Sequence, residues 1–451
     1  MNVVDSDALV LYFAGPKTAT GEDVLELHVH GGPATVKAVL GAIPKSPSSG
    51  TIRYADPGEF TKRAFLHNRL DLAQVESLGD ILAAETEQQR KSAVRGASGV
   101  LGKTYEKWRN HLLLARGEIE ALIDFSEDQH FDESPTELLA NVTNLVKDIL
   151  HSIQLYKDGS QRSGLLRNGI RIALLGPPNV GKSSLMNLIV GREASIVSSE
   201  AGTTRDIVEA SLDIRGYLCS FADTAGIRTS SRSSPDDVDS LPIGAIEEEG
   251  IRRARRKAKD SDVIIVLASV EHDEKGQHRL RYDIETLHLA TSAQQCLIVI
   301  NKCDVADHQT LSGLVREFKE SVLGSIRGLS HAEPLAISCM TAESPAVGLT
   351  DPGQIQALTE KLVQSFSQLT SLPDDMQHLF GVTERQHQLL EQCRRHLEDF
   401  MAEAIPRETA DEPDIVLAAE CLRHAANSLA AITGRGEFGD VEEVLGVIFE
   451  K

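Results

Sequence analysis

One segment limits the possible folds of this chain more than any other, Gly176-Pro-Pro-Asn-Val-Gly-Lys-Ser183, which directly follows the apolar run Ile170 to Leu175. This pattern predicts a strand, a phosphate-binding loop and then a helix. The glycines let the backbone wrap a phosphate, so that N–H groups and the start of the helix point at it. We expect Lys182 to neutralise the outer phosphates and the Ser183 hydroxyl to bind magnesium. The chain is therefore predicted to bind a nucleoside triphosphate.

A second motif, Asn301-Lys302-Cys303-Asp304, predicts which base is bound. It ends the apolar run Cys296 to Ile300, so a strand would deliver the Asp304 carboxylate to accept two N–H bonds from guanine. Adenine offers no such pair of donors, and a buried carboxylate left unpaired is costly. A helix cap is the plain alternative for this motif. The order of the motifs along the chain, with this one after the phosphate loop, favours guanine recognition.

A third motif, Asp223-Thr-Ala-Gly226, follows the run Tyr217 to Ala222. We expect Asp223 to hold magnesium through water and the Gly226 N–H to sense the terminal phosphate, although such a segment alone could be a simple turn. Together the motifs predict a set of GTP-binding residues. They are Asn179, Val180, Gly181, Lys182, Ser183, Ser184, Asp223, Thr224, Ala225, Gly226, Asn301, Lys302, Asp304, Ser338 and Cys339.

Length and composition limit the class of protein. At 451 residues the chain is too long for one core, and about three domains are expected. A net charge of −21 argues against a generally basic nucleic-acid-binding surface, although a local patch is compatible with it. The six cysteines have no metal-ligand spacing, which favours a reducing compartment. We expect no membrane span, because no apolar run approaches about 20 residues, and no signal peptide is visible.

The chain divides into regions of different pattern. Short β-like runs at 8–13 and 24–29, separated by turn clusters, predict a small α+β unit. Helical periodicity runs from Leu70 to about Leu155 and resumes near Pro373. Between them, strands alternate with helices as in a mostly parallel sheet. The strands are expected at 170–175, 208–214, 218–222, 263–268, 296–300 and 335–338, and the domains at 1–68, 69–165, 166–371 and 372–451.

Several segments together resemble the MnmE (TrmE) family of tRNA-modification GTPases. They are the phosphate loop, Ala201-Gly-Thr-Thr-Arg-Asp206, Thr20-Gly-Glu-Asp-Val-Leu-Glu-Leu27, His30-Gly-Gly-Pro33, Asp56-Pro-Gly-Glu-Phe60 and Asn68-Arg-Leu-Asp-Leu-Ala-Gln74. The resemblance runs along essentially the whole chain. It implies an α/β fold in which a Ras-like P-loop GTPase domain is inserted in a helical domain. A partial α+β domain that binds a tetrahydrofolate one-carbon donor precedes them.

The resemblance also implies an activity and partners. Members of the family form homodimers and act with an FAD-dependent partner of the MnmG (GidA) type. Together they place an aminomethyl-type group on C5 of the wobble uridine of tRNA, and GTP hydrolysis drives the reorganisation. In that family, potassium-assisted pairing of the two GTPase domains switches hydrolysis on.

The resemblance assigns metal ligands and catalytic residues. Potassium would be bound by Asn179 and by the loop that supplies Ser198, Glu200 and Thr203, and it would replace an arginine finger. A loop-stabilising Asn179 is the plain alternative. Magnesium would be bound by Ser183 and by Thr204, which resembles the switch threonine. The predicted catalytic residues are Glu247, which would orient the attacking water, Thr204 and Lys182.

Three further features have a functional and a plain interpretation. The carboxylates around Glu247 could simply favour a helix N-terminus. The run Arg252 to Lys259 is either a solvated helix face or a contact with tRNA or a partner. The resemblance makes Glu26 the partner of the folate pterin and Arg69 that of its carboxylate tail, but Glu26 could equally be a salt-bridged core residue. A metal site at His28 and His30 is rejected, because no acidic or cysteine partner lies at ligand spacing.

The sequence also departs from the family pattern. Met1 stands past the family's first strands, and the C-terminal cysteine motif is absent. Ser338-Cys339-Met340 replaces the usual Ser-Ala-Lys. With the longer loop between Arg228 and Pro242 and the low basicity, these features resemble a nuclear-encoded mitochondrial member of the family. The resemblance alone implies this location, and a cytoplasmic location is the alternative. Two alternatives remain: a ribosome-assembly GTPase of the Era/EngA kind, and a truncated inactive binding module.

Overall fold

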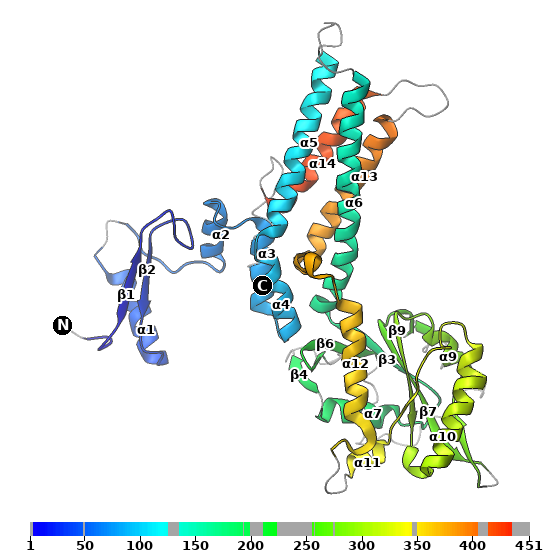
Figure 1. Ribbon diagram of the computed structural model, residues 1–451. Helices are drawn as coiled ribbons and strands as arrows, with labels where there is room; N and C mark the ends of the chain where they lie inside the picture. Colours follow the sequence, from blue (N-terminus) through cyan, green and yellow to red (C-terminus); the bar gives the residue numbers. More distant parts are fainter. Residues whose placement is uncertain are drawn as a thin grey trace, which may run out of the picture. The chain divides into compact units, whose positions relative to one another are not determined.

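The computed structural model describes residues 3–47, 50–124, 135–192, 194–198, 211–222, 255–256, 258–273, 276–344, 350–404 and 414–434. The chain forms two compact units. The first comprises Met1–Ala83, Ala93–Ser160 and Asp375–Lys451, and the second comprises Ala84–Ser92 and Gln161–Asp374. The second unit is thus inserted between two segments of the first, as the sequence predicts (Figure 1). The residue boundaries at 68, 165 and 371 stay predictions.

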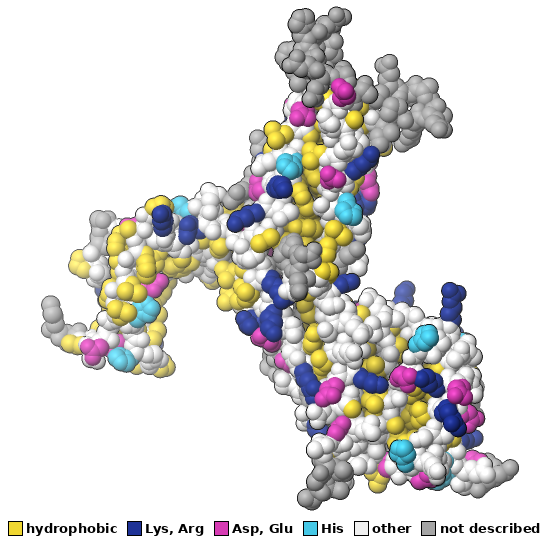
Figure 2. Space-filling model, viewed as in Figure 1, with side chains coloured by type: hydrophobic (Ala, Val, Ile, Leu, Met, Phe, Trp, Pro, Cys, Tyr) yellow, Lys and Arg dark blue, Asp and Glu magenta, His cyan; other side chains and the backbone are white. Residues whose placement is uncertain are grey.

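The first unit begins with a two-stranded antiparallel sheet. Strand β1 (Leu9–Phe13) pairs with β2 (Val24–His28), which confirms both predicted strands. The helices α1 (Pro33–Ala42), η1 (Ile43–Lys45) and α2 (Glu59–Leu66) follow. Much of the apolar surface here is exposed, and Figure 2 shows hydrophobic side chains gathered over this part.

The rest of the first unit is a helical bundle. Its elements are α3 (Leu72–Ala83), α5 (Val100–Asp124), α13 (Glu384–Ala404), α14 (Ile415–Thr433) and the larger part of α6 (Pro135–Asn168) and η7 (Asp374–Gly381). Helix α4 (Glu87–Gly96) is divided between the two units. Helix α14 packs against α5 and α13 because its small and branched apolar residues form one broad face. The single tryptophan, Trp108 on α5, packs edge-to-face against Tyr105 and Tyr156.

Helix α14 bears on the prediction that no segment spans a membrane. Among the described residues it is the one helix that is long and apolar enough to do so. However, 56% of its apolar stretch is buried inside the protein, where it forms the core of the bundle. Its composition is therefore explained by packing against α5 and α13.

In the part of the chain that the structure describes, the second unit is built on an eight-stranded sheet in the order β10-β9-β7-β3-β6-β5-β4, with β8 paired to β7. The strands are β3 (Ile170–Leu175), β4 (Ala194–Ser198), β5 (Ser211–Ile214), β6 (Tyr217–Ala222), β7 (Val263–His272), β8 (His278–Arg281), β9 (Gln295–Asn301) and β10 (Leu335–Ala336). The neighbouring strands from β10 to β6 pair in parallel. The pairs β6–β5, β5–β4 and β7–β8 are antiparallel.

This sheet agrees with the prediction from the apolar runs. All six expected strands are found, although residues 208–210 lie outside the described part and β10 has two residues instead of four. The sequence analysis did not predict strands β4 and β8.

The helices and short turns of this unit are α7 (Lys182–Arg192), α9 (Ile284–Ala290), η3 (Cys303–Val305), α10 (His308–Glu317), η4 (Phe318–Val322), η5 (Leu323–Ser325), α11 (Cys339–Glu343), η6 (Pro352–Gln354) and α12 (Ile355–Thr370).

Candidate nucleotide site and N-terminal contact network

The phosphate loop lies between β3 and α7 and has the backbone that its sequence predicts. Gly176, Asn179 and Gly181 have positive φ angles of 141°, 64° and 98°. A Cβ on Gly176 would lie 2.3 Å from the carbonyl oxygen of Leu267 on β7, so no larger residue fits there. The loop is therefore held tightly against the neighbouring strand, with its fold set by these glycines.

The predicted phosphate and magnesium ligands lie at the start of α7. Lys182 Nζ donates hydrogen bonds to the carbonyl oxygens of Gly176 and Pro177, both at 2.8 Å. The ammonium group therefore lies across the loop, where it can exchange a carbonyl partner for a phosphate oxygen. The side chains of Ser183 and Asn179 are exposed, whereas Val180 is buried and anchors the loop.

Asn301 joins the phosphate loop to the base-binding motifs. Its side chain is 2% exposed; Nδ2 donates to the carbonyl oxygen of Val180 at 2.8 Å, and Oδ1 accepts from the Cys339 N–H at 3.1 Å. A Cβ on Gly181 would lie 2.2 Å from Asn301 Nδ2, so the glycine makes this bridge possible. The N–H of Cys339, one of the predicted GTP-binding residues, thus binds a side chain of the protein itself in this structure.

Asp304 is oriented by the segment that follows β10. The Ser338 hydroxyl donates to Asp304 Oδ1 at 2.6 Å, and the rest of this exposed carboxylate faces outward. The Ser338 N–H is held in turn by the Gly353 carbonyl oxygen at 3.0 Å. The three segments that carry Val180, Asp304 and Ser338 therefore meet at one edge of the parallel sheet, where α/β folds bind ligands.

Glu271 at the end of β7 is a site residue that sequence reasoning missed. Lys302, whose φ is 61°, donates from Nζ to Glu271 Oε1 at 3.2 Å, and Arg281 on β8 lies 3.4 Å from Oε2. Burial alone would raise the pKa of Glu271, but the hydrogen bond and charge of Lys302 lower it below its ordinary value. The ion pair fixes the side chain of Lys302 within the base motif. The only available signal was an acid at the end of a long apolar run.

The cysteines near the site are structural. All six cysteines are free thiols. Burial raises the pKa of Cys303 to about 12 and that of Cys339 to about 11, so both thiols stay neutral near pH 7 and are poor nucleophiles. Met340, which stands where a lysine is usual, is 72% exposed.

Several predicted residues lie outside the described part of the chain. These are Glu200, Thr203, Thr204, Asp223, Thr224, Ala225, Gly226 and Glu247. Ser198 ends β4, but only its backbone is described, and of the basic run 252–259 only Arg255, Arg256, Ala258 and Lys259 are included. The magnesium, potassium and water-orienting roles given to these residues stay predictions.

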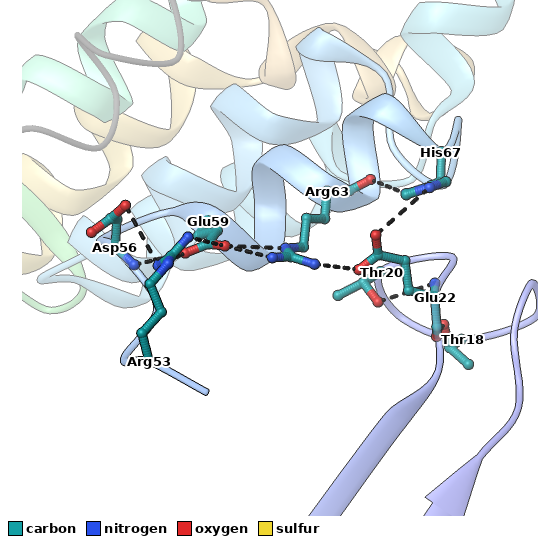
Figure 3. Close-up of polar contacts among 8 residues, drawn as sticks. All are labelled: Thr18, Thr20, Glu22, Arg53, Asp56, Glu59, Arg63 and His67. Atoms are coloured by element: carbon teal, nitrogen blue, oxygen red, sulfur yellow. Dashed lines mark hydrogen bonds and ion pairs between the residues drawn. The ribbon is translucent and has the colours of Figure 1, made fainter. Parts of the chain in front are cut away.

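A network of ion pairs organises the N-terminal part (Figure 3). Glu59 on α2 accepts from Arg53 at 2.8 Å and from Arg63 at 2.7 Å. Arg63 also donates to Glu22 at 2.6 Å, which ties α2 to the turn before β2. The buried Thr18 closes that turn by donating to the Glu22 carbonyl oxygen at 2.5 Å.

The predicted folate residues flank this turn. Gly21 has a φ of 82°, and a Cβ there would lie 2.4 Å from His67 Cβ and 3.5 Å from Arg69 Cγ, so Arg69 lies beside the turn. Glu26 lies on β2, where it pairs with His28 at 3.1 Å. Because the Glu26 side chain is 48% exposed, the alternative of a salt-bridged core residue is wrong. No described contact joins Glu26 to Arg69.

The histidines of this region have separate carboxylate partners. His28 pairs with Glu26, and His30 pairs with Asp5 at 2.7 Å. Among the described residues, no group of three or more histidine, cysteine or acidic side chains could hold a metal ion. The pKa of Asp5 lies below its ordinary value because the backbone N–H and the ring of His30 form hydrogen bonds with its carboxylate.

The N-terminal network should respond to acid. Hydrogen bonds from Arg53 and then Arg63 lower the pKa of Glu59 from 4.5 to about 2. A lowered pKa gives stability that is present above pH 4.5 and lost as the pH falls toward 2. We expect Glu59→Gln to reduce amide protection of the 18–23 turn at pH 6, and the difference from the wild type to vanish near pH 2. Hydrogen exchange at matched pH measures this; an equal difference at both pH values would contradict it.

A phosphate loop, a serine at the start of the following helix and a guanine-type base motif, all on a mostly parallel sheet, together define a P-loop protein of the guanine-nucleotide-binding class. Comparison with known proteins gives the family. Residues 72–451 match the family model described as the MnmE helical domain, and residues 1–69 match the one described as the GTP-binding protein TrmE N-terminus.

Curated relatives agree with the family models. The tRNA modification GTPase MnmE of Rickettsia bellii (strain OSU 85-389) is 34% identical over 456 residues, which cover 100% of this chain and 86% of the relative. That of Parvibaculum lavamentivorans is 37% identical over 441 residues, covering 98% and 84%. The chain therefore belongs to the MnmE (TrmE) family, which confirms the resemblance seen in its motifs.

Solved structures give a weaker likeness. The elongation factor SelB from Methanococcus maripaludis aligns with 44% of this chain and 36% of its own, at 15% identity and a TM-score of 0.28. The cytosolic domain of FeoB from L. pneumophila aligns with 61% and 98%, at 17% identity and 0.26. At these scores the likeness carries no argument about this chain.

Proposed function

We propose that this chain hydrolyses GTP and that hydrolysis serves modification of the wobble uridine of tRNA. The observation that carries the GTP assignment is the Asn301 side chain, which ties the phosphate loop at Val180 to the base segment at Cys339. Ser338 orients Asp304 in the same place. Membership of the MnmE family supports the link to tRNA modification.

The residues of the site divide the chemistry between them. Lys182 carries positive charge to the outer phosphates, and Ser183 offers a hydroxyl to the magnesium ion that neutralises charge on the triphosphate. Asp304 accepts from the base edge. Glu247 is proposed to orient the attacking water and Thr204 to respond to the terminal phosphate. Each role needs only positioning and fixed charge, which is how phosphoryl transfer is catalysed.

Potassium is proposed to complete the site. The exposed Asn179 side chain projects from a left-handed backbone position in the phosphate loop, and its neutral oxygen suits a monovalent cation. Ser198, Glu200 and Thr203 are the proposed remaining ligands. A cation there would stabilise charge that develops between the phosphate oxygens, as an arginine finger does.

The proposal extends to cofactor, partners and location. Arg69 and Glu26 are proposed to hold a tetrahydrofolate one-carbon donor, supported by the match to the TrmE N-terminal model. A homodimer, an MnmG-type FAD-dependent partner and a mitochondrial location are further parts of the proposal, and family membership is their support. The described residues after 371 form only helical elements, which disfavours an Era-type RNA-binding domain there.

GTP turnover in potassium and in sodium tests the proposal. We expect turnover in potassium to be at least about tenfold faster and to rise with protein concentration. Asn179→Gly should abolish this stimulation while GTP binding is kept, because glycine tolerates the positive φ. Asn187→Ala, on the exposed side of α7, is the matched control. Equal turnover in the two salts would refute the potassium role, and no turnover at all would favour an inactive module.

The tRNA role needs a separate measurement. Mass spectrometry of tRNA nucleosides from cells that lack this chain should show loss of the modified wobble uridine. Re-expression of the wild type should restore it, and Lys182→Ala, which removes the charge from the phosphate loop, should not. Unchanged wobble nucleosides after deletion would remove the pathway but leave GTP hydrolysis untouched.

A further inference from the structure

A pocket of about 620 Å³ lies in the first unit, beside the predicted folate residue Arg69. One wall is the segment from Arg69 to Gln74, which links α2 to α3. The other wall is the first part of α5, including Lys103 and Lys107. The volume is within the range of about 300–1,000 Å³ that small-molecule sites occupy.

The floor of this pocket is held in shape by groups that are already satisfied. Asp71 Oδ1 accepts from the Gln74 N–H at 2.8 Å, and Gln74 Nε2 donates to the Ala97 carbonyl oxygen at 3.1 Å. Gly102 brings α5 close, because a Cβ there would lie 1.9 Å from Asp71 Oδ2. The pocket is thus a fixed feature of the fold rather than a gap between mobile side chains.

The charges that line the pocket divide into two kinds. The acids are engaged: Asp71 caps α3, and Glu106 accepts from Thr433 at 2.6 Å and lies 3.5 Å from Arg109. The cationic side chains have no such partners among the described residues. No contact within the described part of the chain gives the side chains of Arg69, Lys103 or Lys107 a hydrogen bond or an ion pair.

The spacing of these cations is regular. Lys103 and Lys107 are four residues apart on one face of α5, so their side chains are about 6 Å apart along the helix. Arg69 lines the same pocket from the opposite wall segment. A row of cations repels itself unless an anion joins it, and this row stands out in a chain with a net charge of −21.

We propose that this pocket binds the poly-γ-glutamate tail of a folate. Arg69 takes the first tail carboxylate, and Lys103 and Lys107 take those that follow. The proposal rests on the folate role given to Arg69. A γ-linked tail presents one carboxylate per residue, which matches single positive charges spaced along one pocket. An RNA backbone is the other anion that a row of cations could bind, and the binding experiment distinguishes the two.

Binding of reduced folates with one and with five glutamates tests the proposal. Calorimetry on the full chain should show the pentaglutamate binding at least about tenfold more tightly, with a preference that weakens as salt rises. Lys103→Gln combined with Lys107→Gln should remove the preference and leave the monoglutamate affinity within about twofold. Lys37→Gln combined with Lys147→Gln changes the net charge equally, away from the pocket, and should keep the preference.

The outcomes separate this proposal from the proposed function. If the wild type binds both forms equally, the tail pocket is refuted and the folate role of Arg69 stands. If neither form binds, the folate role itself fails and the tail pocket with it. If the Lys103 and Lys107 changes weaken tRNA binding but leave the folate preference, the row contacts RNA and the proposal is overturned. Urea unfolding followed by Trp108 fluorescence serves as the folding control. Each variant should show the same unfolding transition as the wild type.

Discussion

Asp304→Asn is expected to lower the affinity for GTP by at least about 100-fold and to make xanthosine triphosphate the better ligand. Guanine presents two N–H donors at this edge, which suit a carboxylate that only accepts. Xanthine replaces the amino group by a carbonyl, and an amide offers one donor and one acceptor to match it. Ser338 already holds Asp304 Oδ1 at 2.6 Å, so the group is positioned before the base arrives. Displacement titrations with both nucleotides measure the change.

Two further variants show whether this effect is specific. Asp307→Asn changes a nearby carboxylate that caps α10 through the Gln309 and Thr310 N–H groups, both at 3.0 Å. Asparagine caps helices as well as aspartate, so GTP affinity should be unchanged. Ser338→Ala should weaken GTP binding only about threefold to tenfold, because it removes an orienting group. A GTP affinity of Asp304→Asn within threefold of the wild type would show that Asp304 does not contact the base.

The central strands could be predicted from the sequence because they are buried on both faces. Residues of β3 and β7 form nearly continuous apolar runs, as parallel strands covered by helices do. Strands β4 and β8 lie at the antiparallel parts of the sheet. Serines interrupt the apolar residues of β4, and three of the four residues of β8 are basic or histidine, so no long apolar run marks either strand. The predicted β10 was too long because only Leu335 and Ala336 pair with β9.

The candidate site was predictable to the extent that its motifs are local. The phosphate loop and the Asn301 to Asp304 motif each lie within a few residues, and their backbone geometry follows from glycine and strand patterns. The bridge from Asn301 to Val180 spans 121 positions, and the contact of Arg63 with Glu22 spans 41. Such pairs depend on the completed fold, and so does the Glu271 contact with Lys302. No local pattern marks them.

The second large effect concerns the stability of the helical bundle. Glu76 on α3 accepts from Arg385 at 2.5 Å and from Gln386 at 2.7 Å, both at the start of α13. Arg385 also donates to the carbonyl oxygens of Ala431 and Ile432, at 2.9 and 3.0 Å, in the last turn of α14, where carbonyl groups have no partner within the helix. One guanidinium therefore joins three helices. Arg385→Met should lower the free energy of unfolding by roughly 3 kcal/mol, because a carboxylate that is 10% exposed loses its cation.

Trp108 gives this prediction a clean measurement, because the single tryptophan lies in the core of the bundle and reports the first unit alone. Urea unfolding followed by its fluorescence should show the loss for Arg385→Met. Arg423→Met, which removes an exposed partner of Glu420 on α14, should cost less than about 1 kcal/mol. Adding Glu76→Gln to Arg385→Met should restore part of the stability, because no uncompensated charge then remains inside. If both arginine variants lost the same amount, the pairing with Glu76 would contribute no more than a surface ion pair, and the three helices would be held by apolar packing alone.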